Sequence, residues 1–200
     1  MTTPHVIGRG DAVSWAIAAG LKTVVHDLDE SVLPKSGSVV IVIGVDPVLE
    51  PTHICTLSAT EWRRFAEQPM RQALSALQRS YSSMHKEGGR IVLVLPSIGM
   101  TGGPYLVPST TALEGIRAMA KSAARQWASE NVIINIIAAP LHLFATKLSA
   151  SAAHVTAAAL QDDDKLIESV IATTRFLLKR DVTGLVGATI VVDGGAVMLP

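Results

Sequence analysis

The 200-residue sequence lacks several features that would indicate common classes of protein. It has one cysteine, Cys55, so no disulfide can form within the chain. Lysine plus arginine equals aspartate plus glutamate at 17 each, so no net charge attracts the protein to nucleic acid or to an anionic membrane. The six histidines show no metal-ligand spacing. We therefore expect neither nucleic-acid binding nor a metal site.

Long hydrophobic runs are also missing, although 48% of the residues are hydrophobic. The most apolar region, 132–145, is interrupted by Asn135, Pro140 and His142, which excludes a membrane-spanning helix and makes a membrane partner unexpected. Residues 1–11 have neither the basic start nor the apolar core of a signal peptide, so we expect a cytoplasmic protein. The length predicts one domain over 1–200, and high apolarity with few charges predicts an obligate oligomer.

The most informative stretch is 88–115, GGRIVLVLPSIGMTGGPYLVPSTTALEG. Its apolar run from Ile91 to Leu95 ends in Pro-Ser and then Gly, as is typical of a parallel strand covered on both faces. Such a strand places Ser97 at its carboxyl end, where open α/β sheets hold their ligands and reacting groups. The sequence therefore predicts an α/β fold.

The segment after the first turn allows two interpretations. Apolar residues recur at every third or fourth position, which is the pattern of one helix face: Val13, Ile17, Leu21, Val24, Leu28 and Val32. Alternatively, 22–29, KTVVHDLD, forms a second strand. That strand would leave only 30–38 for a crossover, whereas parallel strands normally need a dozen residues or more. We expect one helix over 12–31, although Gly20 inside it costs about 1 kcal/mol.

Three local patterns predict where other helices begin. Ser58 and Glu61 are spaced as a capping box. Pro69 has no backbone N–H and is expected to start a fresh helical segment. The acidic run 162–164 is expected to be a solvated helix start, since carboxylates favour a helix N-terminus.

The stretch 88–115 resembles the active-site segment of the short-chain dehydrogenase/reductase family, in which a strand ends in a catalytic Ser and the next helix carries Tyr-x-x-x-Lys. The segment TIVVDGG at 189–195 is similar to the family's final strand. The resemblance covers nearly the whole chain. It implies a Rossmann-like, doubly wound parallel sheet, shortened by about one βαβ unit before Val39.

Of the family's four catalytic positions, only Ser97 carries the usual residue. The resemblance places Leu106 at the Tyr position, Thr110 at the Lys position and Pro69 at the position of a helix Asn. Tyr105 lies one residue from the family's Tyr register and is the candidate for a displaced general acid. Ser97 and Tyr105 are therefore the candidate catalytic residues.

The family's Thr-Gly-x-x-x-Gly-x-Gly cofactor turn corresponds to 8–14, where only Gly8 and Gly10 remain. A side chain in such a turn blocks the approach of a pyrophosphate to the helix N-terminus, and Asp11 adds a charge that would repel it. If the second-strand alternative holds, Asp27 takes the place of the family's ribose-binding acid. Gly8, Gly10 and Asp27 are the candidate cofactor-binding residues, but we expect no cofactor on this chain.

This selective replacement implies a non-catalytic subunit, or pseudoenzyme. We expect it to pair with a catalytically active paralogue of the same family in a hetero-oligomeric alcohol dehydrogenase or ketoreductase, a tetramer, with NAD(P) bound by the partner subunit. One alternative is an atypical NAD(P)-dependent oxidoreductase that uses Ser97 and Tyr105. Another is a regulator that binds a small molecule in the former substrate cleft.

Overall fold

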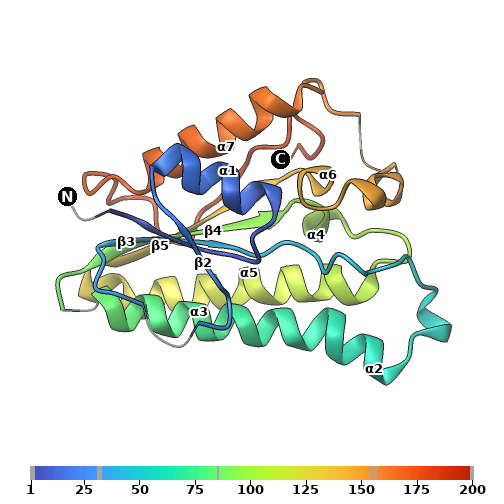
Figure 1. Ribbon diagram of the computed structural model, residues 1–200, viewed down its shortest axis with the longest axis horizontal. Helices are drawn as coiled ribbons and strands as arrows, with labels where there is room; N and C mark the ends of the chain where they lie inside the picture. Colours follow the sequence, from blue (N-terminus) through green and yellow to red (C-terminus); the bar gives the residue numbers. More distant parts are fainter. Residues whose placement is uncertain (1–2, 31–32, 85, 154, 156, 199–200) are drawn as a thin grey trace.

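Six parallel strands form one sheet in a computed structural model that describes residues 3–30, 33–84, 86–153, 155 and 157–198 (Figure 1). The strand order is β2-β1-β3-β4-β5-β6. The strands are β1 (His5–Ile7), β2 (Val25–His26), β3 (Ser38–Val42), β4 (Gly89–Pro96), β5 (Val132–Ala139) and β6 (Thr189–Val191). The order reverses between β1 and β3, as in a doubly wound sheet. The predicted α/β, Rossmann-like architecture is confirmed.

Helices cover both faces of the sheet (Figure 1). One face carries α1 (Ala12–Leu21) and α7 (Asp163–Leu177), and the other carries the two long helices α3 (Gln68–Met84) and α5 (Val107–Trp127). The shorter helical segments are Ile54–Thr56, α2 (Ala59–Trp62), the π-helical turn Arg63–Glu67, α4 (Ile98–Thr101), Ala128–Glu130, α6 (Leu141–Phe144) and Thr146–Ala152.

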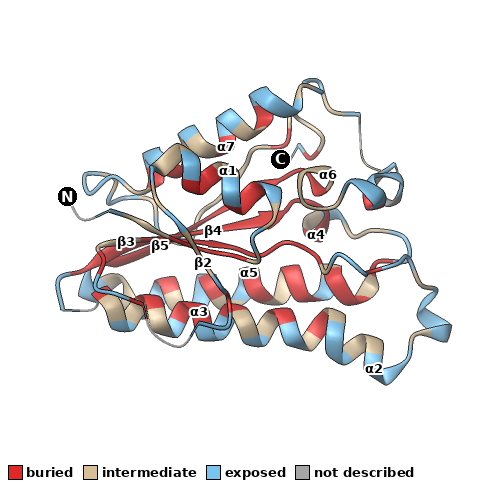
Figure 2. Ribbon diagram, in the orientation of Figure 1, coloured by how far each residue is buried: buried red, intermediate tan, exposed pale blue. Residues whose placement is uncertain are grey.

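Alternate residues of each central strand belong to two separate cores. Val39 and Ile41 pack on the side of α3 and α5, whereas Val40 and Val42 pack on the side of α1 and α7. The central strands are therefore buried on both faces (Figure 2). Each aliphatic side chain buried in this way contributes about 1.5–3 kcal/mol, so the strands form a firm base for the residues at their carboxyl ends.

The predicted helix over 12–31 is wrong, and the second-strand alternative is the one the structure adopts. Helix α1 ends at Leu21, and Lys22 takes the left-handed conformation at φ 56° and ψ 49°. The Lys22 N–H donates to the carbonyls of Ala18 and Ala19, which closes the helix. Strand β2 then pairs in parallel with β1.

The apolar periodicity was misleading because its residues are divided between the two cores. Val13 and Ile17 pack with α7, while Leu28 packs on the α3 and α5 side of the sheet. The two-residue β2 is followed by 27–30 and 33–37, and these described residues form neither a helix nor a strand. Helix α3 holds this connection, with Arg79 Nη2 donating to the Leu28 carbonyl at 2.5 Å.

The three predicted helix starts are confirmed. The Ser58 N–H donates to Glu61 Oε2 at 2.8 Å, and the Glu61 N–H donates back to Ser58 Oγ at 3.2 Å. The Asp162 carboxylate accepts the Lys165 N–H at 3.1 Å and caps α7. Helix α3 begins directly before Pro69, after the π-helical turn.

Candidate functional site

The carboxyl end of β4 leads into Ser97, which begins the short helix α4. Ser97 is only 5% exposed, and its N–H donates to the Ala139 carbonyl at 2.7 Å. This bond continues the pairing of β4 with β5 for one more residue. Ser97 is therefore held rigidly by the two central strands, as the sequence predicts for its position.

Ser97 lines a pocket of about 290 Å³ at this end of the sheet. The other lining residues are mostly apolar and come from α4, α6, the segment after it, and the chain end near Val197. His142 also lines the pocket, and its Nε2 lies 2.9 Å from Asp163 Oδ1, which links α6 to α7. Helix α6 and the segment after it therefore form one wall of this pocket.

Asp193 lines the same pocket, but its carboxylate is already used. It is 2% exposed and accepts the N–H groups of Gly195 and Ala196 at 3.1 Å and of Val197 at 3.0 Å. These bonds fix the turn after β6. Asp193 therefore shapes the pocket, and the other polar side chains among its described lining residues are Ser97, His142 and Ser149.

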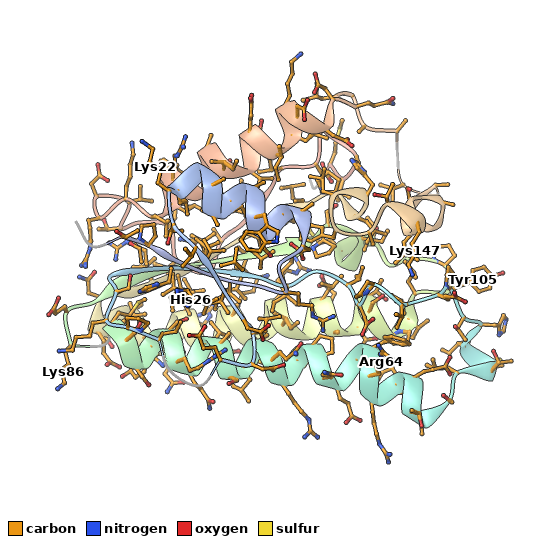
Figure 3. The ribbon with its side chains drawn as sticks, in the orientation of Figure 1. Lys22, His26, Arg64, Lys86, Tyr105 and Lys147 are labelled. Carbon is orange, nitrogen blue, oxygen red and sulfur yellow. The ribbon has the colours of Figure 1, made fainter. Side chains whose placement is uncertain are left out.

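Tyr105 lies outside this pocket. It has a left-handed φ of 63° and is 55% exposed, and its backbone carbonyl accepts the Thr52 N–H at 2.9 Å. Its ring is 6.0 Å from that of His53, and Figure 3 shows it at the outer edge of the molecule. The structure does not bring Tyr105 and Ser97 together.

The residues at the family's other catalytic positions have structural surroundings. Leu106 is fully buried in the core beneath α5. The Thr110 hydroxyl donates to the carbonyls of Leu106 at 3.0 Å and Val107 at 3.3 Å, within its own helix. Pro69 is buried on α3. None of these three side chains offers an acidic or basic group.

The turn from β1 to α1 is closed by its own side chains. Asp11 is the N-cap of α1, and its Oδ1 accepts both the N–H and the hydroxyl of Ser14 at 2.7 Å. Ser14 is fully buried, and a Cβ added at Gly8 would overlap the Ser14 Oγ. The carboxylate of Asp11 therefore takes the place at the helix N-terminus where a bound anion would accept hydrogen bonds.

A second side chain covers the point where the strand order reverses. Gly44 follows β3, and a Cβ added there would lie 3.0 Å from Asp11 Oδ2 and 3.1 Å from Phe144 Cδ1. Phe144 ends α6 and packs against the core on the α1 side. Dinucleotides bind in the crevice at such a reversal, and here Asp11 and Phe144 both lie next to Gly44.

Asp27 directly follows strand β2 and lies beside the turn that contains Gly8. The Gly8 N–H donates to the His26 carbonyl at 2.9 Å, so Asp27 directly follows a residue bonded to the turn. Its own Oδ1 accepts the Asp29 N–H at 2.8 Å, within an exposed loop. The structure thus brings together the three predicted cofactor-binding residues, Gly8, Gly10 and Asp27, but the turn between them is filled.

Arg9 ties this turn to its neighbours, a role that the sequence analysis missed. Its guanidinium donates to Gln72 Oε1 on α3 at 2.9 Å and lies 3.9 Å from Asp46 Oδ2. Arg64 donates to the same Asp46 oxygen at 3.0 Å. The three segments are far apart in sequence, so no local pattern predicts these contacts.

The charge of Asp46 is stabilised by this arrangement. Partial burial raises its pKa, but the Val48 N–H, the hydrogen bond and charge of Arg64, and the charge of Arg9 outweigh it, so the pKa is lowered overall. Asp46 therefore stays ionised and holds the Arg9 turn in place.

The described ranges contain neither a cluster of metal-binding side chains nor a membrane-spanning helix. No group of three or more His, Cys, Asp or Glu side chains is placed to hold a metal ion there. None of the helices built from those residues is long and apolar enough to cross a membrane.

One comparison with known families matches nearly the whole chain. The family described as Enoyl-(Acyl carrier protein) reductase matches residues 16–197. The matched range contains Ser97, the pocket and the final strand, and it begins after the Asp11 turn. Together with the all-parallel, doubly wound sheet, this match shows that the chain belongs to the short-chain dehydrogenase/reductase family.

Proposed function

We propose that this chain is a non-catalytic subunit of its family. It pairs with a catalytically complete paralogue in a hetero-oligomeric alcohol dehydrogenase or ketoreductase, in which the partner subunit binds NAD(P). The observation that carries the proposal is the Asp11 carboxylate hydrogen-bonded to the N–H and hydroxyl of Ser14. An internal carboxylate at a helix N-terminus competes with, and repels, a phosphate group.

The remaining catalytic positions support the same proposal. A general acid contributes roughly 100- to 10,000-fold to rate and must lie within hydrogen-bond reach of the reacting atom. Tyr105 is exposed and lies outside the Ser97 pocket. The side chain of Thr110 has no positively charged group that could bind a nicotinamide ribose. These placements weigh against an oxidoreductase that uses Ser97 and Tyr105.

The surface of α3 supports pairing with another subunit. In this family the two long helices pack against those of a second subunit, and Leu74 on the outer side of α3 is 43% exposed. An exposed leucine on a helix that already packs on the core is suited to a further helix contact. We propose that the partner covers this face.

Co-expression with catalytically complete family members from the same organism tests the pairing. We expect co-purification with one of them at a mass near a tetramer, measured by size-exclusion chromatography with light scattering. Leu74→Glu should weaken the complex, whereas Glu168→Lys, an exposed change on α7 at the opposite face of the sheet, serves as the control. A stable homo-oligomer that binds no such partner would contradict the pairing.

Cofactor binding is tested separately on the isolated chain. The phosphate turn is closed, and Thr110 stands at the position of the family's lysine. Each loss of about 1.4 kcal/mol of binding free energy lowers affinity tenfold, so together these changes should weaken dinucleotide affinity to the millimolar range. Titration with NADH and NADPH, followed by fluorescence, should therefore show no saturation at micromolar concentrations. Micromolar binding by the chain alone would overturn the non-catalytic proposal and revive the oxidoreductase alternative.

The pocket beside Ser97 favours a second candidate, a regulator that binds a small molecule. Its volume of about 290 Å³ is at the lower end of ligand pockets, and its lining is mostly apolar with hydroxyl and imidazole groups at Ser97 and His142. A small, mostly apolar alcohol or ketone fits this lining. A thermal shift with such compounds that is abolished by Ala153→Trp and independent of nicotinamide would support this candidate.

A further inference from the structure

A second recessed region lies at the amino ends of the strands, opposite the Ser97 pocket. Two pockets of about 270 and 440 Å³ adjoin there, because Gly37 and Arg180 line both. We call this region the basic cleft and define it by the six cationic residues that line it. These residues are Lys22, Lys35, Lys86, Arg175, Lys179 and Arg180.

The larger pocket of the basic cleft has four cationic residues and, among the described residues that line it, no carboxylate. The smaller one includes a single acid, Glu87. Across the described part of the chain, none of the six cations has an ion pair within 4.0 Å. Because the whole sequence carries no net charge, this end of the molecule is unusually positive.

Helix ends offset part of this positive charge. Helices α1 and α7 both end beside the larger pocket, and each C-terminus carries about half a negative charge. Arg175 Nη2 donates to the Gly20 carbonyl at 2.5 Å, and Arg180 Nη1 donates to the Glu87 carbonyl at 3.4 Å. The two helix ends together offset about one unit of charge, so about three of the four remain.

A buried cation supports the wall of the cleft. Arg90 is 1% exposed, and its Nη2 donates to the Arg180 carbonyl at 2.8 Å. Its other hydrogen bonds also go to oxygens of backbone or amide groups rather than to a carboxylate. Arg90 therefore fixes the backbone that carries Arg180 and adds to the positive potential behind it.

We propose that the basic cleft binds a small organic polyphosphate. Lysine and arginine are the usual phosphate ligands, and a recessed site restricts the ligand to a small molecule in a way that a flat basic surface does not. Pro4, Leu21 and Leu178 line the larger pocket beside the cations and provide an apolar surface for the organic part of the ligand. A nucleoside polyphosphate has this combination of groups.

Isothermal titration calorimetry with ATP and with inorganic pyrophosphate tests the proposal. At about 50 mM salt we expect saturable binding of one ATP, weaker at about 200 mM because the contacts are ionic. The double variant Lys22→Gly with Lys179→Gln should bind ATP at least tenfold more weakly. Glycine tolerates the left-handed conformation of residue 22, so the variant keeps its fold, which circular dichroism checks.

Lys147→Gln is the matched control, because Lys147 lies at the opposite end of the molecule from Lys22 and Lys86 (Figure 3). Its ATP affinity should equal that of the unmodified protein. Absence of saturable ATP and pyrophosphate binding up to about 1 mM would overturn the proposal. So would an undiminished affinity of the double variant. Tighter binding of a DNA oligonucleotide or of phosphatidylserine vesicles than of ATP, lost in the same variant, would replace the small ligand by a macromolecular one.

Discussion

Asp11 joins two effects in a single side chain, since it caps α1 and closes the turn after β1. Its Oδ1 accepts the Ser14 N–H, one of the helix donors that lack a partner within the helix. We predict that Asp11→Ala lowers the free energy of unfolding by about 1 kcal/mol, as for other N-cap losses. Urea unfolding followed by circular dichroism measures this change.

Asp11→Asn is the informative companion variant. Asparagine caps a helix nearly as well as aspartate but carries no charge, so the free energy of unfolding should change by less than about 0.5 kcal/mol. Equal losses in both variants would show that the charge, rather than the cap, stabilises the turn.

The pair of His5 on β1 and His26 on β2 makes the stability of this sheet edge depend on pH. Their Nδ1 and Nε2 atoms lie 3.1 Å apart, and burial and the charge of His26 lower the pKa of His5, with Glu30 opposing them. The folded protein therefore binds fewer protons than the unfolded chain just below the usual histidine value of 6.5.

Stability should consequently fall as the pH decreases through about 6.5 and level off below the lowered pKa of His5. Urea unfolding at pH 7.5, 6.5 and 5.5 should show this loss, and His5→Gln should reduce it. The exposed His53→Gln should leave the slope unchanged. A steeper slope for His5→Gln would contradict this assignment.

At the scale of elements, the end of α1 is set by one residue in an unfavourable conformation. A left-handed backbone costs a residue with a side chain roughly 1 kcal/mol, whereas glycine adopts it freely. Lys22→Gly should therefore stabilise the protein by up to about 1 kcal/mol in urea unfolding. Lys22→Ala removes the same charge but keeps the conformational cost, so it should bring no gain.

Elements defined by short-range patterns were predictable from the sequence. The apolar run of β4 and the Ser58 capping box each depend on neighbouring residues alone, and both are present as expected. The end of α1 was not predictable in this way. Its apolar spacing continues into β2, and only tertiary packing separates Ile17 in one core from Leu28 in the other.

At the scale of the whole molecule, Arg90 joins segments that are far apart in the sequence. Its guanidinium donates to the carbonyls of Gly89, Asn131 and Arg180, at the start of β4, before β5 and after α7. We predict that Arg90→Ala lowers the free energy of unfolding by about 3 kcal/mol, because buried carbonyls lose their donors and a cavity remains. Thermal and urea unfolding both measure this.

The surface variant Arg71→Ala provides the comparison. Its side chain is 80% exposed and forms an ion pair at 3.7 Å with Glu67, so its removal should change stability by less than about 1 kcal/mol. A loss at Arg90→Ala no larger than at Arg71→Ala would show that the three segments are held without the guanidinium.

The candidate site was only partly predictable, because some of its residues are positioned by contacts between segments that are distant in the sequence. The positions of Ser97 and of the turn at Gly8 follow from strand ends, which the sequence marks. The orientation of the Tyr105 side chain depends on the left-handed backbone of Tyr105 itself and on its contacts with Thr52 and His53. The contribution of Phe144 arises only when α6 folds back over Gly44.

The closed turn also limits what a single substitution can do at this corner of the sheet. Asp11, Ser14 and Phe144 fill the same corner from two distant segments, so replacing any one of them leaves the other two in place. A change at Asp11 alone loses a cap and gives a phosphate no access. Opening this corner would therefore require several simultaneous substitutions, because each single one removes only part of what fills it.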